Sequence, residues 1–363
     1  MSNDKKQPIN IGFDAKRYFN NQTGLGNYAR WLVNGLHSSS IDYLNYTLFS
    51  PSGDISDEHF RIVQPEYGWK KFGWLWRIWG VNKYLTANKI DIYHGLSNEL
   101  PFGIHKTGVK TMVTIHDLIN LRYPKNYNWI DRQIYKLKLA YAQKVADLIV
   151  VPSAQTKEDL MFYFKTSENK IRIIPLSIPA IPSLGISKKD PYILCISSFN
   201  KRKNLIRLIT AYQSLEHKVY PLIIAGKYGE TYDEVQSLTK NDPFIILKQN
   251  PSTGDIHQLY SNALFCVYPS LFEGFGIPIL EAFAHGKTVA TSNISSMPEV
   301  GGNAAIYFNP LDTKEIAKSL VMLIEQQNRV KLEAQIPIQL KKFDSPILLS
   351  DYVNCYSSLA NKH

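Results

Sequence analysis

The chain has 363 residues, of which 44% are hydrophobic, and a formal net charge of +10. This length exceeds the size at which a single hydrophobic core stops growing, so we expect two domains. No run of about 18 apolar residues occurs and the first residues are polar, which predicts neither a membrane-spanning helix nor a signal peptide. The three cysteines are far apart and form no metal or redox spacing, so we expect a reduced, cytoplasmic protein.

The positive charge is concentrated in the first half of the chain. Residues 1–175 contain 23 Lys and Arg against 15 Asp and Glu, a net charge of +8. Such an excess indicates an anionic partner, for example a membrane surface, a lipid pyrophosphate or a nucleic acid. The cations are dispersed and no nucleic-acid-binding motif accompanies them, so we expect no nucleic-acid partner. An ordinary solvated basic surface explains the charge equally well.

Strand-like and helical segments alternate along the whole chain. In the first half the sequence predicts strands at 9–13, 45–49, 90–94, 111–115, 147–151 and 171–175, and helices at 26–36, 129–145 and 154–162. In the second half it predicts strands at 192–197, 220–225, 244–247, 263–268, 288–291 and 304–308. Such alternation is typical of doubly wound parallel sheets. The Pro- and Ser-rich stretch 176–190 is typical of a linker, so we expect domains at 1–175 and 191–344.

A pair of carboxylates marks the most informative segment. Glu273 and Glu281 lie eight residues apart, with the loop 274–276 and Pro278 between them. A buried strand precedes the loop and Pro278 suits the start of a helix, so we expect Glu281 in the first helical turn and Glu273 at the strand end. Loop amides and a helix N-terminus favour phosphate, and carboxylates bind hydroxyl groups. A sugar nucleotide supplies both.

This segment resembles the E-x7-E motif of retaining nucleotide-sugar glycosyltransferases of family 4, which have the GT-B fold. The resemblance continues through 282–290 and 295–301 and covers nearly the whole chain. It implies an α/β fold of two tandem Rossmann-like domains with the active site in the cleft between them. It also implies that the final helix, about 345–363, packs back on the first domain.

The resemblance implies an activity as well. A retaining transferase would move a hexose from a nucleoside-diphosphate sugar, a co-substrate, to a saccharide or polyprenyl-pyrophosphate-linked acceptor in surface polysaccharide synthesis. GDP-mannose is the favoured donor, and no further cofactor is expected. Glu281 would bind the ribose and Glu273 the transferred sugar, so Glu273 is a catalytic candidate. The donor phosphates would lie against Gly274, Phe275 and Gly276.

Three cations follow the first strand of the second domain. Lys201, Arg202 and Lys203 stand where a helix is expected to begin, and cations there suit a pyrophosphate. The segment resembles the family's R-K-N element, which implies that Arg202 and Lys203 hold the donor diphosphate. No D-x-D sequence occurs, so we expect no metal site.

Glycines and polar residues follow the first strand. Gly24 and Gly26 formally fit a dinucleotide fingerprint, but about ten residues separate them from the strand, where the fingerprint requires a tight turn. They better resemble the family's first-domain glycine loop over the donor phosphate. Asp14 and Arg17, in the same connection, are candidate acceptor contacts or ordinary polar loop residues.

Two histidines end strands of the first domain. His116 and Asp117 follow the strand at 111–115, and the carboxyl ends of parallel strands face the ligand in such folds. They resemble the family's H-D element near the transferred sugar, which makes both catalytic candidates. His94 ends a neighbouring strand and is a weaker acceptor-side candidate.

The segment 67–85 contains four of the six tryptophans, interleaved with Lys and Arg. Such a composition suits contact with a membrane interface. A core helix with basic residues reaching to solvent fits slightly better.

Two other enzyme classes remain open at this stage. A nucleotide-sugar epimerase could share the fold, but the Arg-Lys pair with E-x7-E favours transfer. An NAD-dependent dehydrogenase would rest on Gly24 and Gly26 alone, and the acidic residue it requires after the second strand is absent, since Phe49-Ser50-Pro51 stands there.

Overall fold

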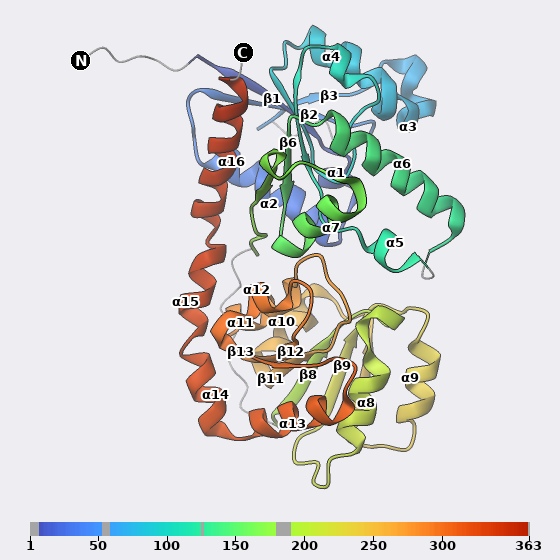
Figure 1. Cartoon of the computed structure of the whole chain (residues 1–363), viewed down its shortest axis with the longest axis vertical. Coiled ribbons are helices and arrows are strands. Elements are labelled where there is room, and N and C mark those ends of the chain that lie inside the picture. Colours follow the sequence, from blue (N-terminus) through green and yellow to red (C-terminus); the bar gives the residue numbers. More distant parts are fainter. Residues whose placement is uncertain (1–6, 53–58, 125–126, 179–189, 362–363) are drawn as a thin grey trace, which may run out of the picture. The chain divides into compact units, whose positions relative to one another are not determined.

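The computed structural model describes residues 7–52, 59–124, 127–178 and 190–361. Contacts divide the chain into two units (Figure 1). Unit 1 comprises Met1–Ser177 and Ser345–His363, and unit 2 comprises Ile178–Asp344. Most of the linker predicted at 176–190 lies outside the described residues.

Unit 1 contains a seven-stranded parallel sheet with the order β3-β2-β1-β4-β5-β6-β7. The strands are β1 (Ile9–Asp14), β2 (Leu44–Phe49), β3 (Arg61–Val63), β4 (Ile92–Gly95), β5 (Lys110–Thr114), β6 (Leu148–Val151) and β7 (Ile171–Ile173). All but β3 were predicted, with ends that differ by one or two residues. β3 is a three-residue edge strand without a buried residue, so it carries no hydrophobic pattern.

Helices cover both faces of this sheet. They are α1 (Lys16–Asn20), α2 (Gly24–Ser38), α4 (Val81–Ala87), α5 (Ile119–Arg122), α6 (Trp129–Val145), α7 (Ala154–Phe164) and α16 (Ser345–Ala360). One core packs α2 and α16 on the sheet, and a second core on the other face contains side chains of α4, α6 and α7. Figure 1 shows α16 on one side of the sheet and α6 on the other.

The tryptophan-rich segment 67–85 is not one helix. It forms a 3₁₀ turn, η1 (Tyr67–Phe72), a short α3 (Gly73–Leu75), a π-helical turn, η2 (Trp76–Gly80), and then α4. Trp76 is completely buried, as the core-helix interpretation requires, whereas Trp69, Trp74 and Trp79 are exposed. Neither interpretation therefore describes the whole segment.

Unit 2 contains a six-stranded parallel sheet with the order β10-β9-β8-β11-β12-β13. Its strands are β8 (Tyr192–Ile196), β9 (Leu222–Gly226), β10 (Ile245–Gln249), β11 (Ala263–Tyr268), β12 (Val289–Ser292) and β13 (Ala305–Phe308). Its helices are α8 (Leu205–Gln213), α9 (Tyr232–Thr239), α10 (Thr253–Asn262), α11 (Ile277–Ala284), α12 (Met297–Gly301), α13 (Thr313–Ile324), α14 (Gln326–Glu333) and α15 (Ile336–Leu340).

Each sheet has one point where the strand order reverses. The reversal lies between β1 and β4 in unit 1 and between β8 and β11 in unit 2. Ligands of doubly wound sheets bind beyond the carboxyl ends of the strands at such a point. The topology therefore directs attention to the loops after β1 and β4, and after β8 and β11.

His94 is a core residue of unit 1, and its prediction as an acceptor contact is wrong for this structure. The side chain is 0% exposed. Its Nδ1 lies 2.8 Å from the Tyr356 hydroxyl on α16, and its Nε2 lies 2.9 Å from Thr114 Oγ1 on β5. The Tyr28 hydroxyl on α2 completes the network, at 2.8 Å from Thr114 Oγ1 and 2.9 Å from the Tyr352 hydroxyl. These bonds join α16 to the sheet and to α2.

Burial lowers the pKa of His94 to about 3, from an ordinary 6.5. The unfolded chain then binds a proton that the folded chain excludes, so stability falls as the pH falls below about 6.5. When the pH is lowered from about 7.5 to 5.5, we expect the free energy of unfolding to fall by roughly 1.4 kcal/mol more for the native chain than for His94→Gln. Urea unfolding at the two pH values measures this difference. The exposed His217 offers a matched control, His217→Gln, which should lose as much as the native chain.

Candidate active site

The reversal point of unit 2 brings together two segments that the sequence places about 70 residues apart. After β8 the chain forms a single 3₁₀ turn, η6 (Lys201–Lys203), and Asn204 then adopts a left-handed backbone, φ 59°, before α8 begins. We expected the three cations at the N-terminus of a helix, but they lie in the 3₁₀ turn that precedes α8. The Asn204 amide donates to the carbonyls of Pro269, at 3.1 Å, and Pro310, at 2.7 Å, which fixes this turn against the loop after β11.

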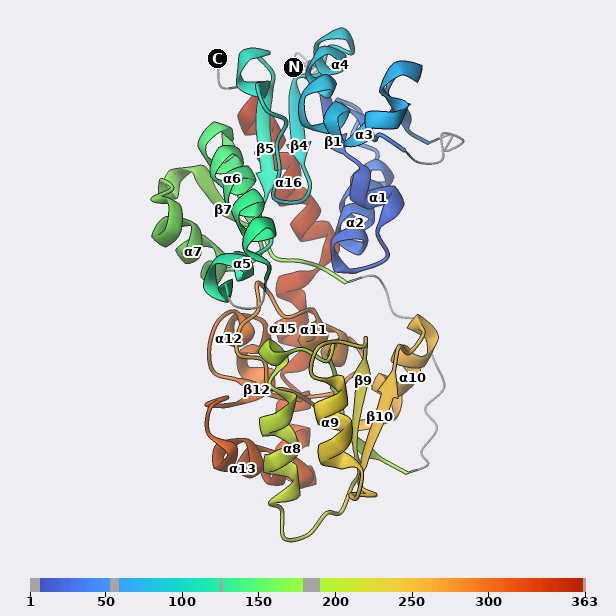
Figure 2. The same ribbon diagram turned by 90° about the vertical axis from the view of Figure 1, so that its right-hand side faces the viewer.

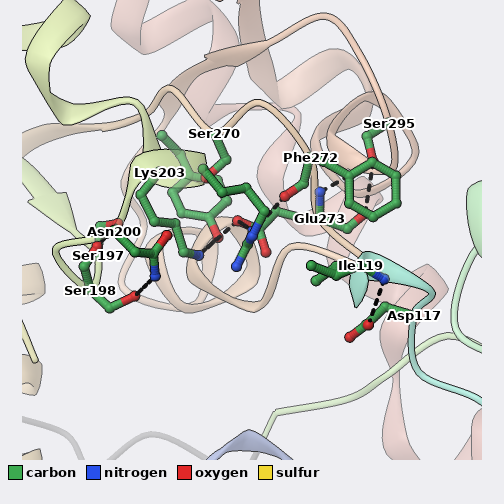
Figure 3. Close-up of polar contacts among 12 residues, drawn as sticks. Asp117, Ile119, Ser197, Ser198, Asn200, Lys203, Ser270, Phe272, Glu273 and Ser295 are labelled. Atoms are coloured by element: carbon green, nitrogen blue, oxygen red, sulfur yellow. Dashed lines mark hydrogen bonds and ion pairs between the residues drawn. The ribbon is translucent and has the colours of Figure 1, made fainter. Parts of the chain in front are cut away.

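Glu273 binds two cations of this turn, one of which, Lys203, is seen beside it in Figure 3. Its Oε1 is 2.6 Å from Arg202 Nη1 and 2.7 Å from Lys203 Nζ. Lys203 also donates to the Tyr268 hydroxyl at 2.7 Å, and its Nζ lies 4.9 Å from the centre of that ring. We call these four residues the cation clasp.

The clasp carries a net positive charge in a buried place. The side chains of Arg202, Lys203 and Glu273 are each 11–13% exposed. Burial alone would raise the pKa of Glu273, but Lys203 and Arg202 together lower it to about 2. Burial lowers the pKa of Lys203, and the Glu273 carboxylate partly offsets this effect. Two positive groups thus share the carboxylate of Glu273, and the four residues of the clasp together carry a net charge of +1.

Serines hold the backbone of the loop between the two glutamates. Ser295 Oγ donates to the Glu273 carbonyl at 2.7 Å and accepts from its N–H at 3.2 Å, and Ser296 Oγ donates to the same carbonyl at 2.9 Å. Gly276 has φ 137° and stands directly before α11, a conformation that a side chain would strain. Gly274 and Phe275 are buried, and the Phe275 ring packs on Phe343 with ring centres 5.8 Å apart.

The prediction that Glu281 lies in the first turn of α11 is wrong. The helix begins at Ile277, and its first turn contains no acidic residue. The Glu281 Oε2 accepts from the Tyr260 hydroxyl of α10 at 2.9 Å, and burial raises the pKa of its carboxyl. The Glu281 carbonyl accepts from His285 Nδ1 at 2.7 Å, so the other ring nitrogen of His285 accepts from His257 Nδ1 at 3.3 Å. Tyr260 thus holds the carboxylate of Glu281, while His285 holds its main-chain carbonyl.

In unit 1, His116 lies just after β5. Its Nε2 donates to the Leu96 carbonyl at 3.0 Å, and its N–H donates to Asn98 Oδ1 at 2.9 Å. Burial is the main reason that the pKa of His116 falls to about 4. The bond to the Leu96 carbonyl opposes this shift, and the positive charge of Arg17 adds to it. The ring is therefore neutral and its Nδ1 carries the lone pair. Arg17, on α1, also reaches Ser97 Oγ at 3.5 Å, which brings the two predicted residues to one edge of the sheet.

The carboxylates of unit 1 have structural partners. Asp117 Oδ1 accepts from the Ile119 N–H at 3.1 Å, which begins α5. Asp14 receives Nε and Nη2 of Arg77, the latter at 2.7 Å, and its side chain is 6% exposed. The prediction of Asp14 as an acceptor contact gives way to its alternative, a structural polar residue.

The glycine loop before α2 is held internally. Asn21 Oδ1 accepts from the N–H groups of Thr23, at 2.8 Å, and Gly26, at 3.2 Å. A Cβ at Gly26 would lie 1.8 Å from the Asn21 carbonyl oxygen, so this glycine permits a close backbone contact. Gly24 is exposed, with open space around its missing Cβ, and is the position of the two with room for a ligand.

The family model for glycosyl transferases group 1 matches residues 179–338, and that for Glycosyltransferase Family 4 matches residues 23–180. O-antigen chain mannosyltransferase B of Escherichia coli is 30% identical over 322 residues, which cover 83% of this chain and 80% of that protein. The chain belongs to the group 1 glycosyltransferases. O-antigen chain mannosyltransferase RfbU of Salmonella typhimurium is 26% identical, with 78% of each chain covered.

Solved structures of similar fold accompany these relatives. A glycosyltransferase of Rickettsia africae has a TM-score of 0.74 at 17% identity and covers 99% of this chain and 100% of its own. Anabaena HepE, in complex with UDP and glucose, has a TM-score of 0.70 at 16% identity, covering 96% of this chain and all of its own. Together with the two parallel sheets, they show the GT-B fold. The family membership supports a glycosyltransferase of polysaccharide synthesis over the epimerase and dehydrogenase alternatives.

Three residues that shape the site of this glycosyltransferase were not predicted from the sequence. Tyr268 could have been found, because it is the last residue of a strand at the reversal point. Ser295 belongs to the segment that carries the family resemblance, but nothing in its sequence indicates that it binds the Glu273 backbone. Tyr260 comes from α10 and reaches Glu281 only through the tertiary fold.

Removal of the Glu273 charge should destabilise the glycosyltransferase, because two buried cations would lose their common partner. For Glu273→Gln we expect a loss of about 3 kcal/mol near neutral pH. The folded pKa lies below the ordinary 4.5, so this contribution is complete above pH 4.5 and is lost as the pH falls toward 2. The difference between native chain and variant should therefore shrink below pH 4.5.

Denaturant unfolding at several pH values measures this difference. Glu281→Gln is the matched control, since a glutamine oxygen can still accept from Tyr260. It should cost less than about 1 kcal/mol. Equal losses for the two variants would show that the cation clasp does not stabilise unit 2.

Proposed function

We propose that the chain is a retaining hexosyltransferase that moves mannose from GDP-mannose to a saccharide or polyprenyl-pyrophosphate-linked acceptor, without a metal ion. The observation that carries the proposal is the cation clasp, in which Arg202 and Lys203 share the single carboxylate of Glu273. A donor diphosphate carries two negative charges close together. It would meet the excess positive charge of the clasp and draw the cations partly away from Glu273.

The clasp would act mainly on the leaving group. When the bond between sugar and phosphate breaks, negative charge grows on the departing nucleoside diphosphate. Preorganised cations in a water-poor site stabilise such charge without reorganising during the reaction. Because Arg202 and Lys203 supply two positive groups, the proposal needs no divalent ion.

The two glutamates would have different duties. Glu281, fixed by Tyr260, would bind the ribose hydroxyls, which do not change during the reaction. Glu273 remains ionised at any physiological pH and would lie near the anomeric carbon, where positive charge develops. It would favour the transition state over the ground state, in which the anomeric carbon carries no developed positive charge.

The anomeric configuration would be retained because the acceptor attacks the same face of the sugar ring from which the nucleoside diphosphate departs. The acceptor oxygen would bond to the anomeric carbon as the carbon–phosphate oxygen bond breaks, and the acceptor proton would pass to the departing phosphate. In unit 1, the neutral His116 would accept a hydrogen bond from a substrate hydroxyl at Nδ1, with Asp117 and Arg17 as neighbouring polar contacts.

The proposed sugar and nucleotide base of the donor are inferred from the similar proteins. Proteins named as mannosyltransferases of O-antigen synthesis are 26–30% identical to this chain, which favours a GDP-mannose donor. HepE, whose structure contains UDP and glucose, is 16% identical and shares the fold. A UDP-sugar is therefore the alternative that the following experiment distinguishes.

The first functional test is a calorimetric panel of GDP, UDP and dTDP with their sugars, each in the presence and absence of EDTA. Lys203→Ala removes one charge-assisted contact worth about 1.5–3 kcal/mol, so it should weaken nucleoside diphosphate binding roughly tenfold to over a hundredfold. Lys201→Ala is the matched control, because Lys201 lies in the same turn and is exposed. It should bind almost as the native chain does.

Three outcomes would contradict parts of the proposal. Equal affinities of Lys203→Ala and Lys201→Ala would remove the diphosphate from the clasp. Preference for UDP over GDP would overturn the donor, and loss of binding and turnover in EDTA would overturn the metal-free reaction.

Steady-state kinetics separate the two glutamates. Glu281→Gln should raise the KM for the donor with a smaller effect on kcat, because it weakens ground state and transition state equally. Glu273→Gln should depress kcat strongly and leave bare nucleoside diphosphate bound at least as tightly as before, since the competing carboxylate charge is gone. If Glu273→Gln loses product affinity and Glu281→Gln keeps it, the two roles are reversed.

A further inference from the structure

Helix α6 of unit 1 has two opposite apolar faces. Leu139 and Ala142 are buried in the core beneath the sheet. Ile130, Ile134 and Leu137 recur at helical spacing on the other side and are 65%, 46% and 67% exposed. A helix that covers a sheet needs one apolar face. The second face therefore requires a separate explanation.

Cations flank this outer stripe. Lys136 and Lys144 are exposed and Arg132 is partly exposed, whereas Asp131 is the single acidic residue of α6. Trp129, at the first position of the helix, is 66% exposed. An apolar stripe with a tryptophan at its end and cations at its sides is the pattern of a helix that lies in a lipid interface.

The segment η1–η2 shows the same combination without any acidic residue between 67 and 85. Trp69, Phe72, Trp74 and Trp79 are 39%, 53%, 61% and 52% exposed. Trp76, by contrast, is buried in the core that also contains the inner side chains of α6. The buried indole anchors the segment while its neighbours project into solvent.

Direct contacts join the two aromatic elements into one surface of unit 1. The Trp79 ring lies 6.0 Å from Phe102, whose ring lies 4.4 Å from Tyr141 on α6. Arg77 of η2 and Lys138 of α6 both bind Glu99, at 2.5 and 3.1 Å. Figure 2 looks onto this side of unit 1, where α6 and the α3–α4 segment are seen with β4 and β5. We call the outer stripe of α6 together with the exposed aromatics of η1–η2 the docking face.

We propose that unit 1 docks on an anionic lipid bilayer through this face. The occupant follows from charge as well as from apolarity. Lys136 and Lys144 of α6 are exposed, and so are Lys71 and Lys83 of the segment 67–85. A protein partner would have to bury these cations against its own carboxylates. A bilayer surface offers phosphate groups to the cations and a headgroup boundary to the indole rings in the same plane. Unit 1 is also the more basic half of the chain, with a net charge of +8 over residues 1–175.

The contact would be peripheral. Within the part of the chain that the structure describes, no helix combines the length and apolarity needed to cross a bilayer. The docking face also reaches the predicted site through α6, because the Tyr135 hydroxyl on the inner side of this helix donates to the Asp117 carbonyl at 2.7 Å. All residues of the docking face belong to unit 1, whereas the cation clasp belongs to unit 2, so the docking proposal does not depend on the identity of the donor.

Co-sedimentation with vesicles tests the docking face in the whole chain. One set of vesicles contains equal amounts of phosphatidylglycerol and phosphatidylcholine, and the other contains phosphatidylcholine alone. The native chain should bind the anionic vesicles, release at high salt, and show tryptophan quenching by brominated lipid. The double variant Ile134→Glu/Leu137→Glu should partition roughly tenfold or more weakly.

The control is Val321→Glu/Ile338→Glu, which places two charges at exposed apolar positions of helices in unit 2. It should bind vesicles as the native chain does. Failure of the native chain to bind anionic vesicles, or equal binding by the two double variants, would overturn the proposal. A concentration-dependent dimer that only the α6 variant loses would assign the face to a second copy instead. Thermal unfolding and nucleoside diphosphate binding report whether each variant is folded, and the lipid quenching of the native chain tests the proposal without any substitution.

Discussion

The site of unit 2 depends on one electrostatic constraint, the sharing of the Glu273 carboxylate by Arg202 and Lys203. Neither cation would be stable in this buried place without a negative partner, and a single carboxylate cannot neutralise both. The clasp therefore keeps a net positive charge when Glu273 is ionised. That property suits a site that must accept a diphosphate and release it after each turnover.

In unit 1, similar polar residues have different roles because they have different bonding partners. His94 and His116 both end strands near the reversal point, yet His94 uses both ring nitrogens to hold α16 and β5, whereas His116 uses one and keeps the Nδ1 lone pair. The carboxylate of Asp14 is likewise paired with the Arg77 guanidinium. The partners of a polar side chain, more than its place at a strand end, decide whether it can meet a ligand.

Most strands and the helices α2, α6 and α7 were predictable, because buried parallel strands form apolar runs and these helices show a helical periodicity. The E-x7-E segment and the Arg202-Lys203 pair were found because they are local in sequence. What could not be predicted was long-range: the ion pairs of Glu273, the Tyr260 bond to Glu281 and the burial of His94 by Tyr356 all join residues more than 20 positions apart. The division of the tryptophans into one buried and three exposed likewise depends on which face the sheet covers.

The central claim, that the cation clasp is the seat of the donor diphosphate, is tested most directly by a crystal structure of the chain with a nucleoside diphosphate. We expect phosphate oxygens within hydrogen-bond distance of Lys203 Nζ and the Arg202 guanidinium, with at least one of the two bonds to Glu273 lengthened or broken. A diphosphate bound elsewhere, with Glu273 still 2.6–2.7 Å from both cations, would contradict the account.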